Sequence, residues 1–203
     1  MTLLDLAPVI PVVVIDDADR AVPLARALLA GGLPAIEITL RTPCALDAIG
    51  RIAAEVPEAV IGAGTVRTPA DVDACVRAGA RFLVSPGVTP TLLDAMLDSG
   101  LPFLPGAATV SEVLTLAERG LRELKFFPAE AAGGVPYLKS LASPIPDVRF
   151  CPTGGITPHT APQYLALPNV GCVGGSWLTP RDALAAGDYT LIQKLAREAA
   201  DLR

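Results

Sequence analysis

The sequence predicts a (β/α)8 barrel with a parallel eight-stranded sheet, formed by residues 1–203 as a single domain. Eight short apolar runs recur at spacings of roughly 20–26 residues, and helix-like segments lie between them. The segment GAGTV (62–66) returns two units later as GAATV (106–110). Strands that alternate with helices indicate parallel βαβ units, and eight such units close a barrel.

Taken in chain order, the elements fit this architecture. The expected strands are VIPVVVI (9–15), AIEITL (35–40), VIGAGT (60–65), RFLVSP (81–86), PFLPG (102–106), ELKFFP (123–128), VRFCPTGG (148–155) and VGCVGGS (170–176). Helix-like segments include 17–32, 44–56, 70–80 and 109–120, and several end in glycine, as helices often do. An open doubly wound sheet is the alternative. It is disfavoured because no glycine-rich dinucleotide motif follows the first strand.

Composition excludes several classes of protein. With 51% hydrophobic and 18% charged residues, the chain is typical of a globular protein rather than a disordered one. No apolar run reaches the length of about 18–20 residues that spans a bilayer, and the N-terminus is a poor secretory signal. The net charge of −5, without a long basic run, argues against nucleic acid. We therefore expect a cytoplasmic protein with neither a membrane nor a nucleic-acid partner.

The cysteines and the one histidine do not form a metal-binding motif. Cys44, Cys75, Cys151 and Cys172 are widely spaced, and no CxxC is present. Because free cysteine is often buried, we interpret these residues as reduced members of the core. With only His159 to add to them, a zinc site of the usual His/Cys type is not expected. The expectation is no metal and no cofactor.

A lysine interrupts one of the predicted strands. Side chains alternate between the two faces of a strand, so Glu37, Thr39 and Arg41 of AIEITLR should share the face toward the barrel axis. By the same alternation, Lys125 and Phe127 of ELKFFP should also face the axis. The chain has only three lysines among its 16 basic residues, so this position is unusual.

Two interpretations of Lys125 are open. It could form a buried ion pair with Glu37 that holds the barrel together, although such pairs often fail to offset the cost of their desolvation. Alternatively, the low dielectric of the interior favours a neutral amine near neutral pH. A neutral amine attacks carbonyl carbons and forms Schiff bases, which makes Lys125 a candidate nucleophile.

Polar residues and glycines gather where the predicted strands end. Arg41 alone is most often an exposed loop residue, but at a strand end its guanidinium suits a carboxylate. Thr65, Thr153 and Ser176 lie beside glycines, where such residues are ordinarily turn formers. The loops after strands seven and eight of these barrels frequently bind phosphate through backbone N–H groups. The residues that fit this role are Gly154, Gly155, Gly174, Gly175 and Ser176.

The motifs EITLRT, GAGTV, SPG, KFFPAE, CPTGGI and GGSW together closely resemble those of the bacterial 2-keto-3-deoxy-6-phosphogluconate aldolases. These are class I aldolases that often also cleave 4-hydroxy-2-oxoglutarate. The resemblance extends from about residue 8 to the C-terminus. It implies a homotrimer of (β/α)8 subunits that needs no metal, with a phosphorylated keto sugar acid and pyruvate as its small-molecule partners. The N-terminal segment is shorter than the leading helix typical of the family, which would weaken the cap over the barrel bottom.

The resemblance also implies roles for individual residues. Lys125 would form the imine, and Glu37 would act as the general acid and base. Arg41 and Thr65 would hold the substrate carboxylate, while Thr153 would orient the hydroxyl side and set the stereochemical preference. The remaining implied contacts are Gly154, Gly155 and Ser176 at the distal phosphate, with Pro86 and Phe127 lining the pocket.

Three other functions are alternatives to this one. The related 2-keto-3-deoxy-6-phosphogalactonate aldolases share the barrel and the lysine, but TLRT and CPTGG favour the gluconate branch. A phosphosugar isomerase or epimerase would share the phosphate loops, yet ribulose-phosphate-type epimerases use a metal and several histidines. A non-catalytic binding barrel would have no use for a buried lysine.

Overall fold

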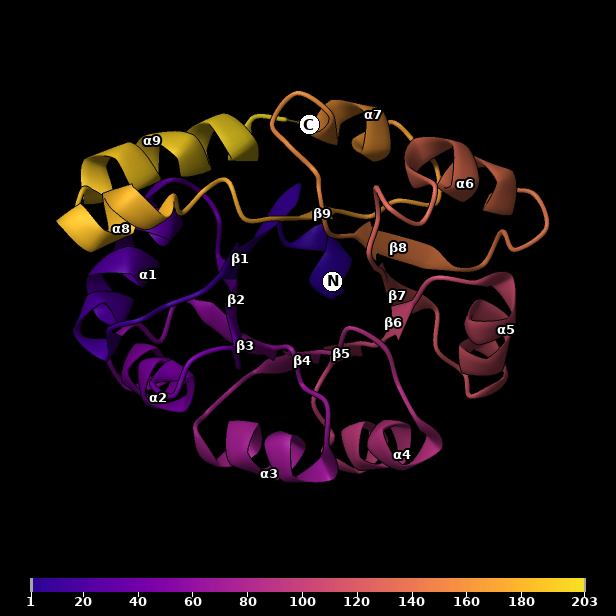
Figure 1. Cartoon of the computed structure of the whole chain (residues 1–203), viewed down its shortest axis with the longest axis horizontal. Helices are drawn as coiled ribbons and strands as arrows, with labels where there is room; N and C mark the ends of the chain where they lie inside the picture. Colours follow the sequence, from indigo (N-terminus) through magenta and orange to yellow (C-terminus); the bar gives the residue numbers. More distant parts are fainter. Residues whose placement is uncertain (1, 203) are drawn as a thin grey trace.

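The computed structural model describes residues 2–202, so Met1 and Arg203, the ends of the predicted 1–203 domain, lie outside the described residues. Short strands alternate with helices along the chain. Figure 1 shows the strands arranged around a central axis and the α-helices outside them. No helix within the described part of the chain is both long and apolar enough to cross a membrane.

The elements have the following bounds. The strands are β1 (Val9–Val13), β2 (Ala35–Thr39), β3 (Val60–Gly64), β4 (Phe82–Val84), β5 (Phe103–Leu104), β6 (Gly106–Ala107), β7 (Glu123–Phe126), β8 (Arg149–Pro152) and β9 (Val173–Gly175). The 3-10 helices are η1 (Leu3–Asp5) and η2 (Ala18–Arg20). The α-helices are α1 (Ala21–Ala30), α2 (Ala45–Glu55), α3 (Pro69–Arg77), α4 (Pro90–Asp98), α5 (Val110–Glu118), α6 (Gly134–Leu141), α7 (Ala161–Leu165), α8 (Arg181–Ala186) and α9 (Tyr189–Ala200).

The strands pair in parallel in two sheets. A six-stranded sheet has the order β5-β4-β3-β2-β1-β9, and a three-stranded sheet has the order β6-β7-β8. Two isolated parallel bridges, Phe150↔Val170 and Thr153↔Gly174, connect the β8 region to the β9 region. The predicted α/β fold with parallel strands is therefore confirmed.

One predicted strand is divided in the structure. The run 102–106 gives β5 and β6, which are separated by Pro105 alone. Proline has no N–H to donate to the strand ladder, so continuous pairing stops there. The carbonyl oxygen of Pro105 still accepts from the Lys125 N–H at 2.9 Å, and Gly106 lies opposite Lys125 in the register.

Threonine caps set the starts of three helices. The side chains of Thr68, Thr89 and Thr109 accept hydrogen bonds from N–H groups in the first turns of α3, α4 and α5. Asp71 and Glu112 complete capping boxes with the first and third of these threonines. Each cap contributes about 0.5–2 kcal/mol, and together they fix the length of the loops that follow β3, β4 and β6.

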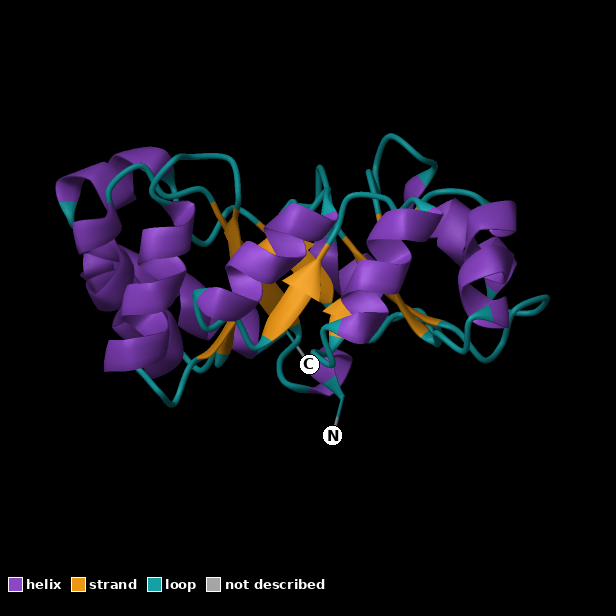
Figure 2. Cartoon of the chain, turned by 90° about the horizontal axis from the view of Figure 1, so that it is seen from below, coloured by secondary structure: helices purple, strands orange, loops and turns teal. Residues whose placement is uncertain are grey.

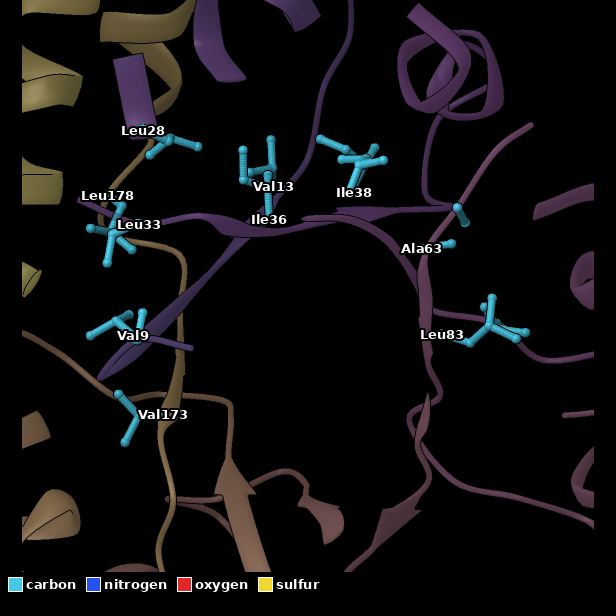
Figure 3. Packing of buried hydrophobic residues seen from close by; sticks show 14 of the residues in the cluster. Val9, Val13, Leu28, Leu33, Ile36, Ile38, Ala63, Leu83, Val173 and Leu178 are labelled. Carbon is cyan, nitrogen blue, oxygen red and sulfur yellow. The ribbon is translucent and has the colours of Figure 1, made fainter. Parts of the chain in front are cut away.

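Two apolar cores lie on opposite sides of the strands. In the outer core, Val13, Ile36 and Ile38 point from β1 and β2 toward the helices (Figure 3). The inner core lies within the ring of strands. Its buried members are Leu3, Leu4, Ile10, Ala35, Phe82, Val84, Leu104, Cys151 and Cys172.

The N-terminal turn η1 fills the lower end of this inner core. Figures 1 and 2 place it on the central axis, below the strands. Leu4 is fully buried, and a Cβ on Gly171 would lie only 2.6 Å from the Leu4 Cβ. Arg149 donates to Asp5 at 2.7 Å, which lowers the pKa of that carboxyl. The short N-terminal segment thus has two buried leucines and an ion pair at the barrel bottom.

We expect Leu4→Ala to lower the free energy of unfolding by about 2–5 kcal/mol, because the side chain leaves a cavity in a packed interior. Urea denaturation measures the change. Leu191→Ala is the matched control, since Leu191 is 37% exposed and should lose little stability on truncation. Equal losses in the two variants would show that η1 does not anchor the inner core.

Candidate active site

Lys125 and Glu37 meet across the interior of the strand ring. They come from β7 and β2, which are not neighbours in either sheet. The Lys125 Nζ lies 3.5 Å from the Glu37 Oε1, and each residue is only 3% exposed. Leu124 and Phe126, on either side of the lysine, belong to the outer core. The alternation of faces predicted for this strand is confirmed.

The amine of Lys125 has few partners for a buried group. Among residues 2–202, Glu37 is its only hydrogen-bond partner, and the Phe127 ring centroid lies 5.2 Å from the Nζ. An ammonium group has three protons to donate, so this environment satisfies it incompletely. The amine therefore keeps donor capacity that a molecule bound beside it could use.

Glycines make the space in which this pair lies. A Cβ on Gly64 would overlap the carboxylate of Glu37, so any side chain at this position of β3 would displace the acid. Gly106 lies beside Lys125 in the register, and a Cβ there would overlap the backbone of Pro86. Gly64 therefore supplies room for the Glu37 carboxylate, whereas Gly106 allows the Pro86 backbone to approach the strand that carries it.

Arg41 and Thr65 form a second polar pair where β2 and β3 end. The Arg41 Nε donates to the Thr65 Oγ1 at 3.1 Å, and Arg41 is otherwise exposed. Thr65 has a φ of 61°, the only positive φ at a non-glycine residue in the described chain. Such a conformation costs a β-branched residue of order 1–3 kcal/mol. The Val66 N–H, which donates to the Val84 oxygen at 3.1 Å, anchors the chain after it.

Thr153 and the glycines after β8 adjoin the end of β9. The Thr153 N–H donates to the Phe126 oxygen at 2.9 Å, and Thr153 bridges to Gly174 on the other side. A Cβ on Gly174 would overlap the Thr153 hydroxyl. Gly154 and Gly155 have φ values of 106° and 81°, in the left-handed region that favours glycine.

The other predicted site residues lie at the ends of β9 and of two further strands, with Pro86 after β4 and Phe127 after β7. A Cβ on Gly154 would contact the Phe127 ring at 3.3 Å, so this aromatic side chain lies between Lys125 and the glycine loop. Gly175 is covered by the Trp177 ring, and Ser176 between them is exposed. The structure thus brings the predicted residues to the ends of β2, β3, β4, β7, β8 and β9.

Sequence reasoning missed residues that matter because of the space they leave or the contacts they make, and not because of a charge. Gly64, which approaches Glu37 closely, lies in the GAGTV motif, but the repeat GAATV has Ala108 at the corresponding position and so gave no signal for this glycine. Ser85 of the SPG motif is fully buried, and its hydroxyl accepts from the Gly106 N–H at 3.4 Å. Glu130, at the end of KFFPAE, contacts the glycine loop, and only the fold reveals it.

Comparisons with known proteins agree on one family. The family model described as KDPG and KHG aldolase matches residues 1–195. The KHG/KDPG aldolase of Escherichia coli (strain K12) is 54% identical over 200 residues, which cover 98% of this chain and 94% of that protein.

Two solved structures are similar over nearly the whole chain. The KDPG aldolase of Legionella pneumophila, with pyruvate captured as a covalent carbinolamine intermediate, has a TM-score of 0.95 and 47% identity. The alignment covers 98% of this chain and 96% of that one. The 2-keto-3-deoxy-6-phosphogluconate aldolase of Zymomonas mobilis ZM4, with 3-phosphoglycerate, has a TM-score of 0.92 and 50% identity, covering 98% and 94%.

We expect Gly64→Ala to displace the Glu37 carboxylate from Lys125, because the added methyl group and the carboxylate cannot occupy the same space. A displacement of about 1 Å can cost a reaction about 10²-fold, so reductive trapping of Lys125 by a small 2-oxo acid should slow by about that factor. Gly50→Ala in α2 is the control, since its Cβ would meet nothing closer than 3.7 Å. Normal trapping by a folded Gly64→Ala protein would contradict the proposed crowding.

Proposed function

Because the chain belongs to the KDPG and KHG aldolase family, we propose that it is a class I aldolase of 2-keto-3-deoxy-6-phosphogluconate. It cleaves this substrate to pyruvate and glyceraldehyde 3-phosphate. The observation that carries the proposal is the buried contact between the Lys125 amine and the Glu37 carboxylate. The same chemistry extends to 4-hydroxy-2-oxoglutarate, which would yield pyruvate and glyoxylate.

The mechanism assigns the nucleophile to Lys125 and the proton transfers to Glu37. The Lys125 amine attacks the C2 ketone, and the resulting carbinolamine loses water to leave a protonated imine that accepts electrons. Glu37, acting through water, removes the C4 hydroxyl proton while the C3–C4 bond breaks. Glyceraldehyde 3-phosphate departs, the enamine is protonated at C3, and hydrolysis of the imine releases pyruvate.

The other site residues hold the two ends of the substrate. Arg41 and Thr65 would bind the carboxylate next to the ketone, supported by their mutual hydrogen bond at the strand ends. Thr153 would orient the hydroxyl side, while Pro86 and Phe127 line the pocket. The distal phosphate would bind at the ends of β8 and β9, through Gly154, Gly155, Gly174, Gly175 and Ser176.

The architecture is part of the same proposal. β5 and β6 are separated by one residue and act as a single strand of the barrel, interrupted at Pro105. With the bridges between β8 and β9, eight parallel strands would then close the (β/α)8 barrel. The family resemblance further supports a single domain over residues 1–203, a cytoplasmic location and assembly as a homotrimer.

A galactonate-specific aldolase is the alternative within the same chemistry. The two substrates differ at one stereocentre, near which Thr153 is proposed to act. The segments TLRT and CPTGG favour the gluconate substrate. A non-catalytic phosphosugar-binding barrel is less favoured, because binding alone gives no reason to bury Lys125 beside Glu37.

Pyruvate and borohydride should together add one stable adduct per chain, located on Lys125. Lys139 and Lys194 serve as internal controls, and peptide mass mapping identifies the modified residue.

Glu37→Gln should slow cleavage by roughly 10²–10⁴ because it removes the general base while keeping the shape of the side chain. An adduct elsewhere, or near-normal cleavage by Glu37→Gln, would refute the respective assignment.

Substitutions of the residues proposed to bind the two ends of the substrate should separate the roles of these residues. Arg41→Ala should impair cleavage of both the phosphorylated sugar acid and 4-hydroxy-2-oxoglutarate, because both carry the carboxylate. Ser176→Asp should strongly raise KM for the phosphorylated substrate alone, since it adds negative charge where a phosphate binds. The measurement is kcat/KM for both substrates in both variants. If folded Ser176→Asp lowers kcat/KM equally for both substrates, the phosphate does not bind at the proposed site.

A further inference from the structure

Glu130 and Tyr164 form a hydrogen bond that the mechanism does not use. The Tyr164 hydroxyl donates to the Glu130 Oε1 at 2.8 Å and joins the segment after β7 to helix α7. Tyr164 is fully buried, whereas Glu130 is exposed. Burial of the ring and the bond to Glu130 raise the pKa of Tyr164, so its hydroxyl remains a donor.

The segment that carries Glu130 also holds the glycine loop after β8. The Ala129 N–H donates to the Thr153 oxygen at 2.8 Å, and the Glu130 N–H donates to the Gly154 oxygen at 3.1 Å. In addition, a Cβ on Gly155 would lie 2.8 Å from the Glu130 Cγ, so the glutamate side chain packs directly against this glycine. Three contacts thus connect residues 129–130 with the loop.

These bonds determine the direction of the loop N–H groups. A peptide unit is planar and trans, so its N–H points opposite to its carbonyl oxygen. Since the Thr153 and Gly154 oxygens face the segment after β7, the N–H groups of Gly154 and Gly155 point away from it. β8 lies between β7 and the β9 region, so that direction is toward Gly174. The phosphate is proposed to bind on this side.

We propose that Glu130 and Tyr164 are positioning residues that hold the glycine loop in its phosphate-binding geometry. The carboxylate is anchored by the buried hydroxyl, and the backbone of the same residue holds the loop carbonyl. Neither side chain is assigned a contact with the reacting atoms. The proposal rests on the proposed aldolase function and extends it to residues that determine preference for a phosphorylated substrate.

Tyr164→Phe removes the hydroxyl and keeps the ring, so the loop loses its anchor while the core remains packed. KM for 2-keto-3-deoxy-6-phosphogluconate should rise about 5- to 10-fold, the size expected for one hydrogen bond, with kcat little changed. KM and kcat for 4-hydroxy-2-oxoglutarate should stay within about twofold, because that substrate carries no phosphate. If Tyr164 has a purely structural role, Tyr164→Phe will impair cleavage of both substrates together. That result would overturn the proposal.

Variants of Glu130 keep the test decisive if Tyr164→Phe is unstable. Glu130→Ala should reproduce the selective rise in KM, whereas Glu130→Gln retains an oxygen that accepts from Tyr164 and should restore most of the affinity. If Glu130→Gln is as impaired as Glu130→Ala, the hydrogen bond is not the anchor, and the proposal fails.

Tyr137→Phe is the matched control. Tyr137 stacks on Phe126 at 5.4 Å between ring centroids, and its hydroxyl has no hydrogen-bond partner among residues 2–202. This variant should therefore leave the preference between the two substrates unchanged. The wild-type protein is assayed alongside. Absence of cleavage by the wild type would refute the proposed function, whereas normal cleavage with an unchanged preference in Tyr164→Phe would refute only the positioning role.

Discussion

The burial of an amine and a carboxylate inside a ring of strands is the constraint on which the rest of this structure depends. Removing Lys125 and Glu37 from water is costly, and a single contact of 3.5 Å offsets little of that cost. The surrounding strands therefore provide space and rigidity. Gly64 and Gly106 keep the neighbouring backbone close without crowding the charged groups, and the threonine caps hold the connecting helices in register.

The interior is divided into an apolar part and a polar part along its axis. Leu3 and Leu4 of η1 fill the lower end. Polar side chains and glycines occupy the other end, where the strands terminate. This separation would allow residues at the proposed reactive end to vary with the chemistry, because the apolar core is held elsewhere.

The sequence predicted this arrangement where local periodicity determines it. Alternating apolar runs and helical segments indicated the parallel α/β fold, and the two-residue repeat of a strand oriented Glu37 and Lys125 inward. Pro105 explains the interruption of this strand once the pairing is known. The sequence does not indicate which strands pair with β5 and with β6. The contact between Glu130 and Tyr164 spans 34 positions and depends on how the segment after β7 packs against helix α7, which no local pattern records. The left-handed backbone of Thr65 was equally hidden, since threonine ordinarily disfavours it.

That left-handed threonine has a consequence for attempts to make the protein more heat-resistant. Asparagine tolerates this backbone region better than a β-branched residue does, so a screen that scores only thermal tolerance should enrich Asn at position 65. Such a replacement would exchange the hydroxyl that receives the Arg41 hydrogen bond for an amide of different reach. Laboratory evolution of this enzyme therefore needs a catalytic assay in every round, because the residue with the strained backbone is also the one proposed to hold the substrate carboxylate.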